Sequence, residues 1–162
     1  MKSKLLGLLA ASAALLACAA HSAQADNLSI KYTTTAQAWT GSGSPLVYLS
    51  GGGVQSFVFT NPLAGYVSVT FNAECQVRGP TSSWLVLRAY IDGNFTAVPP
   101  SGGDTAFCSG SGNTTAAAAV SRPSMTVGKV LSAGSHSFAI TAHVIGSHTQ
   151  TYLDDTITVV AR

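Results

Sequence analysis

The chain has 162 residues, of which 46% are hydrophobic and 9% are charged, and its formal net charge is +2. This length accommodates one domain, or one domain and a tail. Abundant Leu, Val, Ile and Phe with little net charge exclude a disordered chain. Eight basic against six acidic residues provide no basic surface for nucleic acid. The composition therefore predicts a small, weakly charged folded domain, and it specifies no activity.

The N-terminus has the three parts of a secretory signal peptide. Two lysines precede the apolar run Leu5–Ala17, and Ala23-Gln24-Ala25 supplies the small residues of a cleavage site. We therefore expect residues 1–25 to be a helical signal peptide that is removed before Asp26. The remaining residues, 26–162, are predicted to form a single domain that is secreted, periplasmic or held at the cell surface.

An alternative processing route is also present in the signal segment. Leu15-Leu16-Ala17-Cys18 resembles a bacterial lipobox, in which Cys18 would become a lipidated first residue. Lipidation would anchor the protein to a membrane, and this is the one route by which we expect membrane association. The cleavage site ending at Ala25 is the favoured interpretation.

The cysteines predict one cross-link in the exported chain. Removal of the signal peptide takes Cys18 away and leaves Cys75 and Cys108. Two cysteines in an exported domain of this size favour a disulfide, which would close a loop of about 34 residues. Two free buried thiols are the alternative. The histidines are scattered and no second cysteine pair exists, so no metal or cofactor is expected.

Hydrophobic alternation with a period of two residues runs through most of the remaining chain. It is clearest in Gly65–Val77, where apolar residues at six alternate positions share one face. The segment 99–115, which contains Cys108, is predicted to be a loop, and 116–120 to be extended. In the last strand, Leu153, Ile157, Val159 and Ala161 are predicted to share one face. The predicted strands are Leu28–Trp39, Val54–Thr60, Gly65–Val77, Trp84–Asp92, Phe95–Val98, Ser124–Leu131, His136–Ile145 and Tyr152–Ala161.

About eight strands, punctuated by turns such as Asp92-Gly93 and with no helix beyond residue 25, predict an all-β fold. The pattern is typical of an antiparallel β-sandwich of the jelly-roll type.

Two resemblances accompany this pattern. The run Pro62–Val69 and the turn Leu131–His136 resemble segments of the jelly rolls of the C1q/TNF-like family, which implies a jelly roll and a homotrimer. The chain from Phe57 onward also resembles a group of uncharacterised secreted bacterial proteins, and the paired cysteines of that group imply the Cys75–Cys108 disulfide. Neither resemblance implies a catalytic residue. The matching segments of the bacterial group are Ala73-Glu74-Cys75, Asp92-Gly93, Ala106-Phe107-Cys108, Leu131–His136 and Leu153-Asp154-Asp155.

Candidate ligand-binding residues come from one tryptophan and one polar strand face. Trp84, at the start of a strand, could stack on a sugar ring, whereas most tryptophans are packed anchors. A polar stripe on the outward face of the strand that begins at Gly65 could bind a sugar or pair with Arg88, and its members are Asn72, Glu74, Gln76 and Arg78. A solvated sheet face is the alternative for this stripe.

The sequence contains no G-x-S-x-G motif, and we expect no enzymatic activity. The function predicted is an exported, non-enzymatic structural or binding module, with a glycan or a surface protein as its partner. The first alternative is a carbohydrate-binding, lectin-like module that uses Trp84 and the polar face. A pilin-like assembly subunit and a hydrolase rank below it.

Overall fold

The computed structural model describes residues 26–41, 43–96, 106–115 and 117–162. The predicted signal peptide, residues 1–25, lies outside the described residues. Within the described ranges the regular structure consists of β-strands and one short 3-10 turn, η1 (Gly51–Gly53), which confirms the all-β prediction. The strands are β1 (Asn27–Thr33), β2 (Gln37–Trp39), β3 (Ser56–Asn61), β4 (Gly65–Arg78), β5 (Trp84–Ile91), β6 (Asn94–Thr96), β7 (Ala106–Ser109), β8 (Ser124–Leu131), β9 (Gly134–Ile145) and β10 (Gln150–Ala161).

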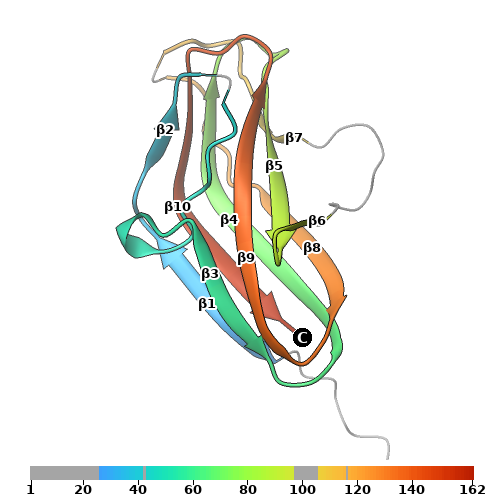
Figure 1. Cartoon of the computed structure of the whole chain (residues 1–162). Helices are drawn as coiled ribbons and strands as arrows, with labels where there is room; N and C mark the ends of the chain where they lie inside the picture. The colour runs from blue at the N-terminus through green and yellow to red at the C-terminus, as the bar shows by residue number, and fades with distance from the viewer. Residues whose placement is uncertain (1–25, 42, 97–105, 116) are drawn as a thin grey trace, which may run out of the picture.

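The strands form two antiparallel sheets that pack face to face (Figure 1). Sheet A has the order β1-β10-β4-β8, and β2 also pairs with β10. Sheet B has the order β3-β9-β5-β6, and β7 also pairs with β5. β1 and β2 pair with successive parts of β10, as β6 and β7 do with β5. Each couple is therefore one interrupted strand, which reduces the sandwich to eight strand positions.

The connections between these positions define the topology. Apart from the β5–β6 hairpin, each connection from one strand position to the next crosses from one sheet to the other. This is the arrangement of a jelly roll, so the predicted jelly-roll sandwich of about eight strands is confirmed. The β5–β6 turn also follows the prediction, because Asp92 and Gly93 both have positive φ, 53° and 71°, as a two-residue hairpin turn requires.

The core lies between the sheets and follows the predicted alternation in β4, β5 and β9. In β4 the apolar residue at every second position is buried, because successive side chains of a strand point to opposite faces. The intervening residues point to the outer side of the sheet, where Gln76 is also buried. The same parity buries the apolar residues of β5 and β9. The largest fully buried side chains are Phe71, Phe138, Leu49, Leu85, Ile91, Ile140 and Leu153.

The predicted face of the last strand is wrong beyond Leu153. The register of β10 against β4 shifts between Asp154 and Ile157, which marks a β-bulge, and Asp155 has a φ of 44°. The extra residue reverses which side chains point inward from that point on. Thr156, Thr158 and Val160 are buried, and Ile157 is 46% exposed.

This reversal is energetically unfavourable within the isolated sandwich. Leaving Ile157 46% exposed forgoes part of the roughly 1.5–3 kcal/mol that full burial of an isoleucine contributes. In its place, Thr158 is buried, and its hydroxyl has no hydrogen-bond partner within the described residues. The local sequence therefore prefers the face that the bulge prevents.

Two predicted connections also differ. Cys108 does not lie in a loop, because Ala106–Ser109 forms β7 and pairs with β5; residues 97–105 lie outside the described residues. At 117–118 the chain turns instead of extending, with the Ala118 amide donating to the Thr115 carbonyl at 3.1 Å. The first segment is a strand because it pairs with β5, which is distant in the sequence, and the second is a local turn. The Gly-, Ser- and Ala-rich composition of these segments does not indicate either feature.

The predicted disulfide is present and joins the two sheets. Cys75 lies in β4 of sheet A and Cys108 in β7 of sheet B, with their Cα atoms 6.3 Å apart. Both cysteines are buried. A disulfide of this kind is typical of proteins that fold in an oxidising compartment.

Candidate functional site

A cleft opens on the outer face of sheet A between the two halves of its interrupted edge strand. β1 pairs with β10 as far as Thr156, and β2 resumes the pairing at Leu153. The bulge of β10 lies in this interval. Bulges re-aim side chains beside functional sites, and a non-glycine residue with positive φ, such as Asp155, is a backbone outlier of the kind that concentrates there.

Side chains from four segments line this cleft, which has a volume of about 280 Å³. Glu74 of β4 lies opposite Asp154 of β10, and Gln76 lies opposite Tyr152. The cleft therefore combines two carboxylates, an amide and a phenol ring on adjacent strands. We call it the β10 cleft, and it is lined by Ala36, Glu74, Cys75, Gln76, Val120, Tyr152 and Asp154.

The polar floor of the β10 cleft is held by a hydrogen-bond network. Gln76 Nε2 donates to the Ala118 carbonyl at 2.7 Å, and Arg78 Nε donates to Gln76 Oε1 at 2.8 Å. Arg78 Nη1 donates to Gln150 Oε1 at 3.0 Å, and the Tyr152 hydroxyl donates to the same oxygen. The amide and the phenol are thereby fixed before a ligand arrives, which lowers the entropic cost of binding.

Arg78 also lies over the aromatic ring of Tyr152, with its guanidinium carbon 4.2 Å from the ring centroid. This is cation–π distance. The contact orients the ring and brings one positive charge to the rim of a cleft that carries two carboxylates.

The carboxylates of the β10 cleft are only lightly engaged. Glu74 pairs with Arg122 at 3.4 Å, but the Arg122 side chain is 78% exposed, and an exposed ion pair contributes little. Asp154 Oδ1 accepts the Asp155 amide at 2.8 Å. Because an ionised carboxylate has about four acceptor positions, both groups retain capacity to accept hydrogen bonds from a hydroxylated ligand.

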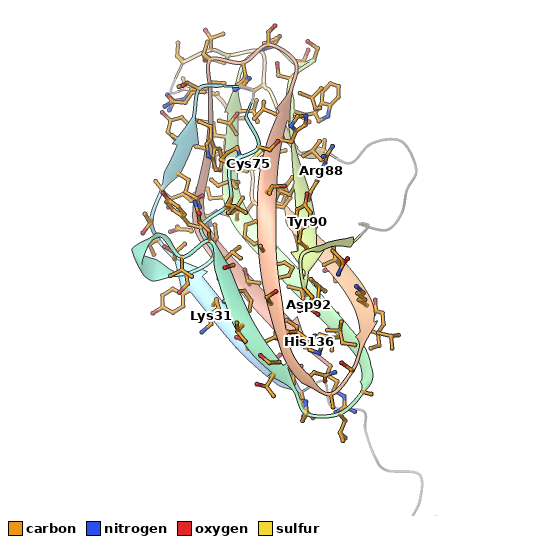
Figure 2. All side chains as sticks on the ribbon, in the orientation of Figure 1. Lys31, Cys75, Arg88, Tyr90, Asp92 and His136 are labelled. Atoms are coloured by element: carbon orange, nitrogen blue, oxygen red, sulfur yellow. A yellow bond between two sulfur atoms is a disulfide. The ribbon has the colours of Figure 1, made fainter. Side chains whose placement is uncertain are left out.

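The four ligand-binding residues predicted from the sequence do not form one site. Glu74 lines the β10 cleft. Asn72 lies two residues before Glu74 on the same outward face of β4, opposite Ile157. Trp84 and Arg88 belong to β5 and alternate with its buried residues, so both face outward from sheet B, on the opposite side of the sandwich (Figure 2 labels Arg88). The predicted pairing of the polar stripe with Arg88 is wrong, because the two lie on opposite sheets and Glu74 pairs with Arg122.

Most of the β10 cleft was not identified from the sequence. Asp154 lies within the predicted strand Tyr152–Ala161, and neither Tyr152 nor Val120 is among the predicted site residues. Asp154-Asp155 within an otherwise uncharged strand is the one local signal, since Asp tolerates the left-handed conformation that a bulge uses. The pairing of β10 with β4, which brings Asp154 to Glu74, has no local signal.

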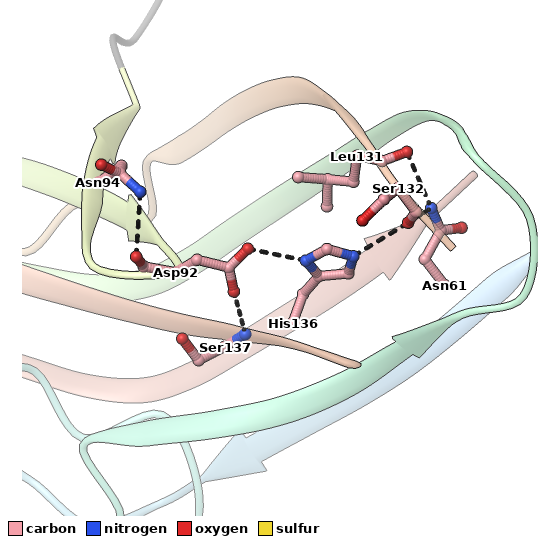
Figure 3. Close-up of polar contacts among 7 residues, drawn as sticks. All are labelled: Asn61, Asp92, Asn94, Leu131, Ser132, His136 and Ser137. Atoms are coloured by element: carbon pink, nitrogen blue, oxygen red, sulfur yellow. Dashed lines mark hydrogen bonds and ion pairs between the residues drawn. The ribbon is translucent and has the colours of Figure 1, made fainter. Parts of the chain in front are cut away.

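A second polar cluster ties together three turns at the other end of the sandwich (Figure 3). His136 Nδ1 donates to Asp92 Oδ2 at 2.7 Å, and Nε2 donates to the Ser132 carbonyl at 3.0 Å. The Ser137 amide donates to the other Asp92 oxygen at 2.8 Å, and Asn61 Nδ2 donates to the Ser132 carbonyl at 2.9 Å. The cluster fastens the β3–β4, β5–β6 and β8–β9 connections, so it has a structural role.

This geometry favours a doubly protonated histidine, because each ring nitrogen faces an oxygen acceptor. The hydrogen bond that His136 donates to the Asp92 carboxylate raises the pKa of His136 above its ordinary value of 6.5, and the same bond lowers the pKa of Asp92 below 3.8.

We therefore expect the free energy of unfolding to depend on pH through this pair. The histidine contribution is fully present below pH 6.5 and is lost as the pH rises through the raised pKa of His136. The aspartate contribution is present above pH 3.8 and is lost as the pH falls through the lowered pKa of Asp92. The expected loss on the alkaline side is about 0.5–1 kcal/mol, because Asp92 is 40% exposed and solvent screens the pair.

Urea unfolding between pH 5 and pH 9 measures this dependence. Asp92→Asn and His136→Gln should each remove the alkaline decline, and the double variant should add nothing further. A decline that persists unchanged in both single variants would assign it to other groups.

In the described ranges no three His, Cys, Asp or Glu side chains lie close enough together to hold a metal ion. No helix among the described residues has the length and apolar character needed to cross a membrane.

No protein-family model and no curated protein matches the chain. Among solved structures it is similar to the EclA C-terminal domain, a sugar-binding protein, with 14% identity and a TM-score of 0.40 over 77% of this chain and 78% of that one. A cycloisomaltooligosaccharide glucanotransferase from Paenibacillus sp. has 18% identity and a TM-score of 0.35 over 78% and 18% of the two chains. The infectious bursal disease virus Gx strain structure has 16% identity and a TM-score of 0.38 over 85% and 34%.

These similarities are too low to carry a functional inference. The protein is a disulfide-linked jelly-roll sandwich, and any function must be argued from its own surface.

Proposed function

We propose that this chain is an exported, non-enzymatic binding module whose ligand is a glycan held in the β10 cleft. The observation that carries the proposal is the assembly of Glu74, Asp154, Gln76 and Tyr152 around one concavity at a β-bulge. Concave sites with a few converging polar groups are the usual form of small-ligand sites.

The chemistry of the cleft suits a polyhydroxylated ligand. Carboxylate oxygens accept hydrogen bonds from hydroxyl groups, and Arg78 at the rim has N–H groups beyond the two that bind Gln76 and Gln150. Tyr152 and Val120 offer apolar surface, of which Val120 is 53% exposed, for the C–H faces of a sugar ring. A preorganised polar floor with apolar walls therefore favours a glycan over a purely apolar ligand.

Binding to a glycan array, followed by calorimetry on the best glycan, tests this proposal. We expect Glu74→Gln and Asp154→Asn each to weaken binding by about tenfold or more, the effect of losing a hydrogen bond to a charged group. Asp155→Asn is the matched control, because Asp155 is the exposed neighbour of Asp154 and does not line the cleft. Its affinity should stay within about twofold of wild type.

Three results would overturn the proposal. Absence of binding by the wild-type protein would remove the glycan ligand. Loss of binding in Trp84→Ala with normal binding in both cleft variants would move the site to sheet B. Cleavage of the bound glycan would contradict the non-enzymatic role.

A further inference from the structure

Beyond the β10 cleft, the outward positions of sheet A in the rows from Tyr66 to Asn72 of β4 are uncharged. The register aligns Tyr32 with Ile157 and Asn72, and Ile30 with Val159 and Thr70. None of the outward positions in these rows carries Asp, Glu, Lys or Arg. We call this surface the apolar face, formed by Ile30, Tyr32, Tyr66, Ser68, Thr70, Asn72, Ser124, Thr126, Gly128, Val130, Ile157, Val159 and Ala161.

Large hydrophobic side chains are concentrated on the apolar face. Five of its members are between 46% and 72% exposed, and they come from all four strands of the sheet. An exposed apolar patch of this kind is more informative than scattered apolar residues. The members concerned are Ile30, Tyr32, Tyr66, Val130 and Ile157.

The β10 bulge indicates that a binding partner covers this surface. Without the bulge, Ile157 and Val159 would point into the core and Thr156 and Thr158 would point to solvent. The structure instead buries both threonines and exposes Ile157, at the expense of a positive φ at Asp155. Departures from local preference are expected at functional surfaces, and a partner on the apolar face would restore the burial that Ile157 lacks.

The edges of sheet A disfavour association by strand addition. β1 and β8 are its outer strands, and each carries a lysine at a core-facing register position, Lys31 and Lys129 (Figure 2 labels Lys31). Inward-pointing charges on edge strands block pairing with another strand. An association through sheet A would therefore use its face.

The size of the apolar face fits a second copy of this chain. Four strands about 4.8 Å apart and seven residues of β4 at about 3.3 Å each span roughly 19 by 23 Å, or about 440 Å² in the plane of the sheet. Two such faces together bury about 900 Å² before side-chain corrugation is counted, the size of a weak, reversible interface. A twofold pair also meets no like-charge repulsion, because the face is uncharged.

We propose that the protein forms a weak homodimer in which the apolar faces of two copies pack against each other about a twofold axis. The ring of Tyr66 lies across Gly128 of the neighbouring strand, and a Cβ at Gly128 would meet the phenol oxygen at 1.8 Å. The absence of a side chain at Gly128 therefore lets the ring lie flat on the sheet, which keeps this surface even enough to pack against another sheet. The proposed dimer does not rest on the proposed glycan ligand.

Sedimentation of the oxidised, exported protein from a few micromolar to several hundred micromolar tests the dimer. We expect a dissociation constant of about 10–100 µM. Val130→Lys should weaken the association by about tenfold or more, because it would bury a charged group without a partner in the interface. Val58→Lys is the matched control, since Val58 is 64% exposed against 72% for Val130 but lies on sheet B.

A second variant, Ile157→Thr, keeps the β-branched shape and should also weaken the dimer. Thermal unfolding of each variant at low protein concentration verifies that it folds. A wild-type protein that stays monomeric at several hundred micromolar would overturn the proposal, as would the trimer that the C1q/TNF-like resemblance implies. A dimer weakened only by Val58→Lys would place the interface on sheet B and would equally overturn it.

Discussion

Replacing Cys75 and Cys108 together by alanine is expected to lower the free energy of unfolding by about 3–4 kcal/mol. The two cysteines are separated by 33 positions in the sequence, and the cross-link restricts the unfolded chain over that whole loop. The bond also connects β4 of sheet A to β7 of sheet B, so its loss loosens the short β7. Chemical denaturation of the oxidised wild type and the double variant measures the difference.

The control for this prediction is the wild-type protein under reducing conditions. Reduction should reproduce most of the loss, because it removes the same constraint while keeping both sulfur atoms. Cys18→Ser should leave the stability of the exported protein unchanged. Two free thiols in the oxidised wild type, or a double variant as stable as the wild type, would contradict the cross-link.

Phe71→Ala is expected to lower the free energy of unfolding by about 3–5 kcal/mol. Phe71 is fully buried in β4, and its ring centroid lies 5.7 Å from that of Phe107 in β7. Truncation therefore leaves a cavity between the sheets, beside the strand that holds Cys108. The surrounding strands are fixed by their ladders and can collapse only partly into that space.

Tyr32→Ala is the matched control for the loss of an aromatic ring. Tyr32 is 69% exposed, so at low protein concentration its removal should change stability by no more than about 0.5 kcal/mol. Denaturant unfolding compares the two variants directly. Equal effects of the two substitutions would show that Phe71 does not occupy a rigid core position.

Much of the fold could be predicted because strand periodicity is a local property. The alternation in Gly65–Val77 identifies the buried face of β4, and Asp92-Gly93 identifies the β5–β6 hairpin. The pairing of Cys75 with Cys108 followed from their number and from the predicted export. The bulge at Asp154–Asp155 was not visible in this way, because a single extra residue reverses the parity of everything after it.

The candidate site was predictable only in part for a different reason. Parity within a strand shows that Glu74 and Trp84 both point away from the core, but it does not show which sheet each strand joins. β4 belongs to sheet A and β5 to sheet B, so the two outward side chains lie on opposite sides of the sandwich. Asp154, which lies about 80 positions after Glu74 in the chain, is instead its direct neighbour across the sheet.

The sequence by itself determined the all-β class, the buried face of most strands and the cysteine pair, because each depends on residue type and spacing along the chain. Only the tertiary structure decided the strand order of the two sheets, the β10 cleft and the outward position of Ile157. These features depend on which distant strands exchange hydrogen bonds. They also depend on a bulge with a strained backbone at Asp155, which forms only when β10 pairs with its neighbours in the sheet. The low charge of the chain is most evident on the outer face of sheet A, where a polar cleft and an uncharged apolar surface lie side by side.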